Sequence, residues 1–191
     1  AYSLLPALQG SASDMARSVS RQKLVGRAVN VLIVGAGAVG QTYGRHLQLG
    51  GASVAFLVKP KYVAEARLGY LTYPLRQRAG RRGEPAVFEG FSVYSTDDIA
   101  AVGTRQWDQV FITVPSNALR GPWLDELLGK IGDATVVMLQ PGLDDRDFML
   151  DRIGEERLVD GVISLIAYQA PLPGEEKRFA RRGVAYLFPP L

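Results

Sequence analysis

The residues Val31-Leu32-Ile33-Val34-Gly35-Ala36-Gly37-Ala38-Val39-Gly40 decide the predicted fold. Four apolar residues form a strand that a sheet would bury on both faces, and a G-x-G-x-x-G pattern follows it directly. Residues 41–49 then predict a helix. Gly35 permits the tight turn, Gly37 lets the backbone approach a pyrophosphate, and Gly40 lets the helix pack closely against the strand. The segment therefore predicts a dinucleotide site in which free amides at the helix N-terminus bind the pyrophosphate.

Beyond this segment, strand and helix patterns alternate and predict a doubly wound α/β domain with a mostly parallel sheet, the NAD(P)-binding Rossmann fold. We expect this domain to span residues 29–191. Further strands are expected at residues 54–58, 107–114, 135–139, 159–166 and 184–188, and further helices at residues 119–128 and 146–153.

Two basic stretches interrupt this pattern. Residues 1–28 are rich in serine, alanine and arginine, and we expect a separate N-terminal extension that is mobile or a remnant of cloning. An organelle transit peptide and a short helix over residues 12–24 are the alternatives. Residues 76–90 predict a solvated loop, with a phosphate or nucleic-acid contact as the alternative. The arginines of residues 76–82 lack the interleaved aromatic residues of a single-strand binding platform.

The composition of the 191 residues excludes several kinds of site. Without cysteine there is no disulfide, thiolate zinc site or cysteine nucleophile, and one histidine, His46, leaves no multi-histidine metal site. Asp144, Asp145 and Asp147 are expected to stabilise a helix N-terminus, so no metal site is predicted. No apolar run approaches the roughly 18 residues that a membrane span needs, and we expect a soluble, cytoplasmic protein. The formal net charge of +3 is compatible with anionic ligands.

The residues after the second expected strand bear on the choice of dinucleotide. NAD and FAD sites usually place Asp or Glu there to bind the ribose 2′-hydroxyl, whereas this chain has Lys59 and Lys61 and no acid before Glu65. A charge-assisted hydrogen bond to a 2′-phosphate contributes about 1.5–3 kcal/mol, which corresponds to about a tenfold to hundredfold preference. The sequence therefore predicts NADP(H) as the cofactor, and a solvated lysine pair is the alternative.

Over residues 30–190 the chain resembles the ketopantoate reductase family (2-dehydropantoate 2-reductases), namely its N-terminal NADP-binding domain. The resemblance rests on residues 31–40, on Lys59, on Phe111-Ile112-Thr113-Val114, on Val137-Met138-Leu139-Gln140-Pro141-Gly142-Leu143 and on Gly161-Val162-Ile163. It implies an NADPH-dependent reduction of a 2-oxo acid to a 2-hydroxy acid in pantothenate biosynthesis. Cofactor binding is assigned to Gly35, Gly37, Ala38, Val39, Gly40, Lys59, Lys61, Val114, Pro115 and Gln140.

In that family, a lysine ammonium from a C-terminal helical domain protonates the developing alkoxide. This chain stops at Leu191, where that domain would begin, so we expect the domain to be absent here and assign no catalytic residue. The family usually has Lys where this chain has Pro115 and Asn where it has Pro141. Proline offers neither a side-chain donor nor an N–H, so Ser116, Asn117 and Gln140 are the nearby candidates for polar contacts.

Two other functions fit the same sequence. One is a catalytically silent NADP-binding or sensing module, which Pro115 and Pro141 favour. The other is nucleic-acid binding through the arginine clusters at residues 76–82 and 178–182. For the leading interpretation we expect a small 2-oxo acid as partner, with a homodimer as one option for the oligomeric state, and neither a membrane nor a nucleic acid as partner.

Overall fold

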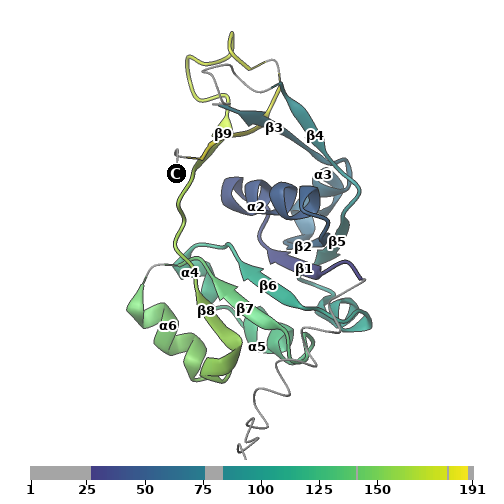
Figure 1. Cartoon of the computed structure of the whole chain (residues 1–191), viewed down its shortest axis with the longest axis vertical. Coiled ribbons are helices and arrows are strands. Elements are labelled where there is room, and N and C mark those ends of the chain that lie inside the picture. Colours follow the sequence, from purple (N-terminus) through teal and green to yellow (C-terminus); the bar gives the residue numbers. More distant parts are fainter. Residues whose placement is uncertain (1–26, 76–83, 141, 180, 189–191) are drawn as a thin grey trace, which may run out of the picture.

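The computed structural model describes residues 27–75, 84–140, 142–179 and 181–188. Within these residues, six strands form the main sheet in the spatial order β5-β2-β1-β6-β7-β8, and every neighbouring pair is parallel. The doubly wound α/β fold is therefore confirmed (Figure 1). The strands are β1 (Asn30–Val34), β2 (Ser53–Val58), β5 (Ser92–Ser95), β6 (Gln109–Ile112), β7 (Thr135–Met138) and β8 (Leu158–Asp160).

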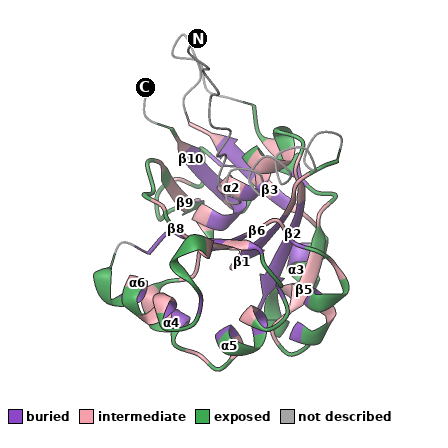
Figure 2. Cartoon of the chain, turned by 60° about the horizontal axis from the view of Figure 1, so that its bottom comes forward, coloured by how far each residue is buried: buried purple, intermediate pink, exposed green. Residues whose placement is uncertain are grey.

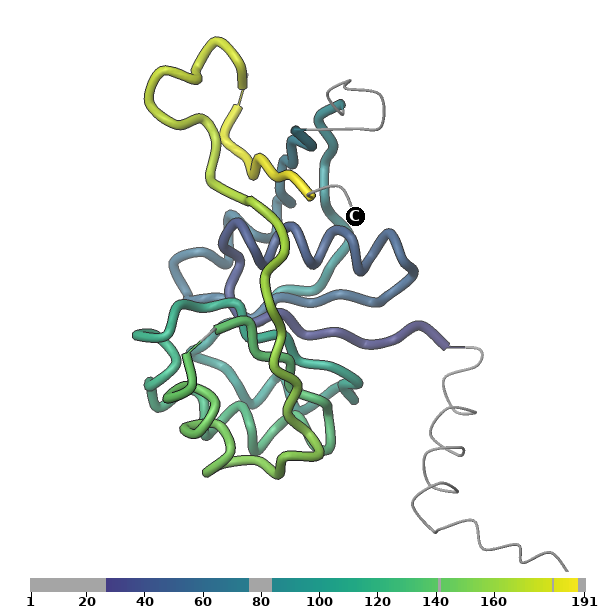
Figure 3. The backbone as a smooth tube through the Cα atoms, turned by 60° about the vertical axis from the view of Figure 1, so that its left-hand side comes forward, coloured from purple at the N-terminus to yellow at the C-terminus, as the bar shows by residue number. Residues whose placement is uncertain are grey.

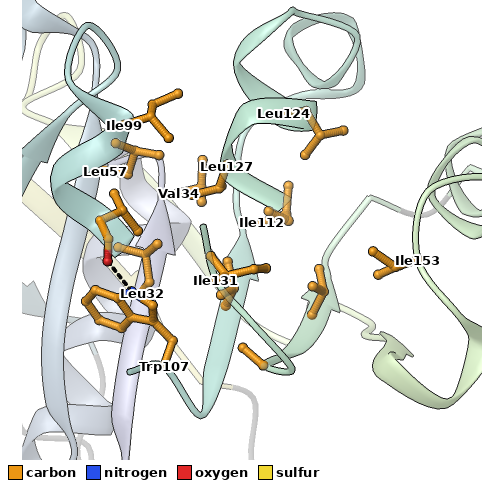
Figure 4. Packing of buried hydrophobic residues seen from close by; sticks show 14 of the residues in the cluster. Leu32, Val34, Leu57, Ile99, Trp107, Ile112, Leu124, Leu127, Ile131 and Ile153 are labelled. Atoms are coloured by element: carbon orange, nitrogen blue, oxygen red, sulfur yellow. Dashed lines mark hydrogen bonds between the residues drawn. The ribbon is translucent and has the colours of Figure 1, made fainter. Parts of the chain in front are cut away.

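Strand β1 is buried on both faces because its side chains alternate between two apolar cores. Leu32 and Val34 belong to the core on one face, which includes Trp107 (Figure 4), and Val31 and Ile33 belong to the core on the other face. None of these four side chains is more than 2% exposed. Figure 2 shows the same concentration of buried residues in the central strands. A continuous apolar run in the sequence is the consequence of burial on both faces.

The helices that cover this sheet differ in detail from those expected. The expected helix 119–128 is wrong in its first half: two short helices meet at Gly121-Pro122, where proline removes a backbone donor. No helix in the described parts of the chain is long and apolar enough to cross a membrane. The helices are α2 (Ala38–Leu49), α3 (Val63–Arg67), α4 (Ser116–Leu119), α5 (Trp123–Leu128) and α6 (Leu143–Leu150), with 3₁₀ turns η1 (Pro60–Tyr62), η3 (Ile99–Thr104) and η4 (Glu155–Arg157).

A second, smaller sheet lies on the far side of α2 from the main sheet (Figure 1). Its order is β4-β3-β10-β9, formed by β4 (Ala86–Phe88), β3 (Tyr70–Pro74), β10 (Gly183–Leu187) and β9 (Ile166–Ala170). Strand β10 is parallel to β3 and antiparallel to β9, and β3 is antiparallel to β4. Helix α2 contacts β1 and β2 on one side and β9 and β10 on the other. The chain therefore sandwiches α2 between two sheets.

The expected single strand over residues 159–166 is wrong. Strand β8 ends at Asp160, and the chain then leaves the main sheet and reaches the second sheet at β9 (Figure 3). Between them Val162 is 87% exposed, and Ile166 at the start of β9 is 61% exposed. An apolar run resembles a buried strand in sequence whether or not another element covers it, which explains the error.

Two other expectations concern segments that lie wholly or mostly outside the described residues. Residues 1–26 and 76–83 lie outside the described residues, so the extension and most of the expected loop are not tested. At the end of that loop, residues 86–88 form β4 and pair with β3, so the loop assignment is wrong there. Phe88 is 2% exposed and packs in the aromatic cluster beneath β2, and this burial favours a strand.

His46 couples the packing of α2 and β10 to pH. Its ring lies edge-on to Tyr186 at 5.3 Å and to Phe188 at 4.8 Å between centroids, and burial together with Arg45 lowers the pKa of His46 below 6.5. The unfolded chain therefore takes up a proton first, and we expect the free energy of unfolding to fall as pH drops from about 7 to about 5. Urea unfolding of His46→Gln should show a smaller fall over this range, and equal pH slopes in both proteins would contradict the assignment.

Candidate functional site

The loop between β1 and α2 is held firmly against neighbouring strand ends. The amide of Gly35 donates a hydrogen bond to the Leu57 carbonyl at 2.9 Å. The Thr113 hydroxyl lies 2.8 Å from the carbonyl oxygens of both Val34 and Gly35 and shares its hydrogen between them. Gly35 has a φ of +96°, which only glycine adopts without strain. The turn is therefore fixed at the point where the strand passes into the helix.

The glycines of this turn have different surroundings. A Cβ on Gly40 would overlap the Gly35 carbonyl oxygen and lie 2.7 Å from Thr113 Oγ1, so Gly40 permits the close contact between helix and turn. A Cβ on Gly37 would meet nothing within 4 Å among the described residues. Gly37 is also the N-cap of α2, which has no side-chain cap and no acid in its first turn. The amides of that first turn are therefore open to an anion.

A cavity of about 720 Å³ opens over this turn. Its walls come from the carboxyl ends of β1, β2 and β6, from the helical turns that follow β2 and β6, and from β9 of the second sheet. Because β2 and β6 lie on opposite sides of β1, this is the point where the strand order reverses. Doubly wound folds bind their ligands at such a point, and the volume suits a small molecule.

The structure brings half of the predicted cofactor residues to this cavity. Gly35, Gly37, Lys59, Val114 and Pro115 line it. The other five are not among its lining residues. Ala38, Val39 and Gly40 form the first turn of α2, beside the cavity. Lys61 lies 4.9 Å from the Tyr62 ring centroid, and buried Gln140 donates to the carbonyl oxygens of Ile112 and Val114. Gln140 thus connects β6 to the end of β7. Its side-chain oxygen Oε1 is buried without a hydrogen-bond partner among the described residues.

Several lining residues were not singled out from the sequence as cofactor contacts. Gln169 comes from β9, and no local pattern could place that strand beside the glycine turn. Arg120 and Trp123 follow β6, and their position depends on the break between α4 and α5. A basic residue just after a strand–helix connection was the one available signal for Arg120. The side chains in this group are Gln41, Tyr62, Glu65, Tyr70, Thr96, Arg120, Trp123 and Gln169. Asn117, predicted from the sequence as a candidate for polar contacts, also lines the cavity.

Among the described residues, three charged side chains line the cavity: Lys59, Glu65 and Arg120. Arg120 Nη1 lies 2.6 Å from Asp145 Oδ1, and the Asp145 side chain is only 4% exposed. A hydrogen bond from Ser116, together with the pairing to Arg120, holds the pKa of Asp145 below its ordinary value despite burial. The carboxylate is therefore ionised at neutral pH, and it fixes the guanidinium at the cavity wall.

The described residues add no evidence for the nucleic-acid and metal sites considered from the sequence. Residues 76–82 of the first arginine cluster lie outside the described residues. In the second cluster Arg178 pairs with Glu175 at 3.4 Å and lies 5.2 Å from the Phe179 ring, both of which are local contacts. Within the described ranges, no three His, Asp or Glu side chains converge as metal ligands do.

The family model described as ketopantoate reductase PanE/ApbA matches residues 31–184. The chain belongs to this family. The match covers the glycine turn, the cavity and both sheets as far as β10. None of the curated protein sequences compared with the chain matches it significantly. Of the two positions expected to depart from the family pattern, Pro115 lines the cavity, and Pro141 lies outside the described residues.

Solved structures of other proteins have a similar fold. The putative 2-dehydropantoate 2-reductase of Enterococcus faecalis has a TM-score of 0.62 at 20% identity, over 85% of this chain and 46% of that one. The 2-dehydropantoate 2-reductase of Geobacter metallireducens has a TM-score of 0.59 at 23% identity, over 84% and 47%. A D-mandelate dehydrogenase solved with NADH and anilino(oxo)acetate has a TM-score of 0.61 at 16% identity, over 85% and 46%. The chain thus spans about half the length of these proteins.

Proposed function

We propose that this chain is the NADP(H)-binding domain of an oxidoreductase that reduces a 2-oxo acid to a 2-hydroxy acid. The observation that carries the proposal is the cavity at the strand-order reversal, where the open side of Gly37 and the side chain of Lys59 line one space. Family membership supports a nicotinamide cofactor. We further propose a cytoplasmic role in pantothenate biosynthesis.

The residues of the cavity fit a dinucleotide phosphate. The uncapped first turn of α2 would hold the pyrophosphate, because its amides are open and Gly37 leaves room beside them. Lys59 directly follows β2, where it would pair with a ribose 2′-phosphate. When bound, the nicotinamide ring supplies the hydride for the reduction. What the chain itself would supply is the anchoring of the pyrophosphate and of the 2′-phosphate, and with it the orientation of the ring.

Titration with NADPH and NADH tests this proposal, with ligand fluorescence as the readout at low salt. We expect wild-type protein to bind NADPH more tightly. Lys59→Glu should remove most of this preference, because a charge-assisted hydrogen bond is replaced by repulsion, a change of about tenfold to hundredfold in the affinity ratio.

Lys61→Glu is the matched control for Lys59→Glu. It makes the same charge change two residues away, but Lys61 lies over the Tyr62 ring and not in the cavity wall. We expect it to keep the NADPH preference apart from a small long-range effect that salt screens. Equal loss in both variants would show that overall charge, and not a contact of Lys59, sets the preference. Undetectable binding of both dinucleotides by wild-type protein would overturn the proposed function.

A second candidate is a silent NADP-binding module. Pro115 favours it, because this residue lines the cavity without a side-chain donor where the family usually has lysine. NADPH binding without any effect of 2-oxo acids on the bound cofactor would support this candidate over the reductase. Oxidation of NADPH that depends on an added 2-oxo acid would exclude it.

A further inference from the structure

The two cationic side chains that line the cavity in the described part of the chain lie on opposite sides of the glycine turn. Lys59 follows β2, and Arg120 follows α4, the short helix after β6. Since β1 lies between β2 and β6, the turn that follows β1 separates the two side chains. A dinucleotide with its pyrophosphate over α2 and its 2′-phosphate at Lys59 would therefore extend its nicotinamide toward the β6 side. This places Arg120 at the end of the cavity where the reaction would occur.

Arg120 is held in place by its surroundings. Its Nη1 bonds to Asp145 at 2.6 Å and to the Ser116 carbonyl at 3.3 Å, and Nη2 bonds to the Asp144 carbonyl at 3.4 Å. Its guanidinium carbon lies 5.0 Å from the Phe148 ring centroid. These contacts come from α4 and α6 and restrict the guanidinium before any ligand arrives. A positioned arginine costs less entropy to bind a ligand than a mobile one does.

The guanidinium still has unused binding capacity. Its five N–H groups make three hydrogen bonds to described residues, so Nε–H and one hydrogen of Nη2 have no acceptor among them. The side chain is 43% exposed and lines the cavity, whereas its partner Asp145 is buried behind it. The planar N–H groups of a guanidinium match the oxygens of a carboxylate.

We infer that Arg120 binds the carboxylate of the 2-oxo acid substrate. The inference rests on the proposed function for the identity of the acid, and on the Arg120–Asp145 pair for the anion-binding group. Pro115 offers no side-chain cation at this wall, and Arg120 is the one cation on the β6 side among the described lining residues. A phosphate of the cofactor is a second anion that a guanidinium binds, and the experiment distinguishes it from the carboxylate of the substrate.

The test is calorimetric titration of the full chain, first with NADP⁺ and then, in the NADP⁺ complex, with 3-methyl-2-oxobutanoate or its uncharged amide. Wild-type protein should bind the acid more tightly than the amide. In Arg120→Gln we expect the affinity for the acid to fall about tenfold to hundredfold, since a charge-assisted pair is lost. The affinities for the amide and for NADP⁺ should change less than about twofold, which is below the effect of one ordinary hydrogen bond.

Two further variants keep the test interpretable. Arg152→Gln is the matched control, because Arg152 also lies over the Phe148 ring, at 3.7 Å, but pairs with Asp125 and does not line the cavity. It should leave acid binding unchanged. Arg120→Gln leaves the buried Asp145 without its cation, so a double variant with Asp145→Asn removes both charges and should fold if the single variant does not. The double variant should lose acid binding in the same way.

Each other outcome has a defined meaning. Unchanged acid affinity in Arg120→Gln, or equal wild-type binding of acid and amide, overturns the inference while the proposed function stands. A fall in NADP⁺ affinity with no separate loss for the acid assigns Arg120 to a cofactor phosphate and overturns the carboxylate assignment. Absence of NADP⁺ binding in wild-type protein overturns the proposed function itself. The acid is then titrated into cofactor-free protein, where loss on Arg120→Gln supports the anion site and no loss overturns it.

Discussion

Gly40→Ala is expected to destabilise the protein by roughly 3 kcal/mol, the upper part of the usual range for overpacking a tight site. The new methyl group would overlap the backbone oxygen of Gly35 and lie 2.7 Å from Thr113 Oγ1. A backbone oxygen cannot move aside as the end of a side chain can. Thr113 is fixed as well, because its hydroxyl bonds to the carbonyl oxygens of two residues in the same turn.

Thermal unfolding followed by circular dichroism measures this effect. For a domain of this size, the loss corresponds to a fall in Tm of about 6–12 °C. Gly103→Ala is a suitable control, because a Cβ there would come no closer than 3.4 Å to the flexible Lys130 side chain. A Tm of Gly40→Ala equal to that of wild-type protein would show that α2 does not pack against the turn as described.

Gly37→Ala is expected to leave the protein as stable as the wild type or slightly more stable, but to weaken cofactor binding. The backbone of Gly37, at φ −73° and ψ −174°, suits alanine, and the new methyl group would meet no described atom within 4 Å. The protein should therefore keep its stability or gain about 0.4–1 kcal/mol, because alanine reduces the freedom of the unfolded chain. The same methyl group would stand in the space where we propose that the pyrophosphate lies.

We accordingly expect NADPH affinity to fall about fivefold to 150-fold in Gly37→Ala, the range that a cost of about 1–3 kcal/mol for overpacking implies. The affinity is measured by the same fluorescence titration as for Lys59, and Tm is measured on the same sample. Unchanged affinity together with unchanged Tm would mean that the ligand does not approach this side of the turn.

Much of the fold was predictable because its signals are local. The run from Val31 to Val34 is apolar at every position since both faces of β1 are covered, and the glycine pattern follows from contacts within a few residues of the turn. The break at Gly121-Pro122 also has a local cause, and the expected helix 119–128 overlooked it. The extra sheet had no comparable signal, because its strands β3 and β10 are about a hundred residues apart in sequence.

The sequence by itself determined the doubly wound fold, the turn at Gly35 and the absence of an acid directly after β2, since each depends on residues adjacent along the chain. Only the tertiary structure decided which side chains share the cavity. Gln169 reaches it because the chain leaves the main sheet after β8 and adds β9 to a second sheet over α2. Arg120 is positioned by Asp145, 25 residues later. Such contacts join segments that are distant in sequence, and packing brings them together without leaving a periodic pattern that the sequence alone could reveal.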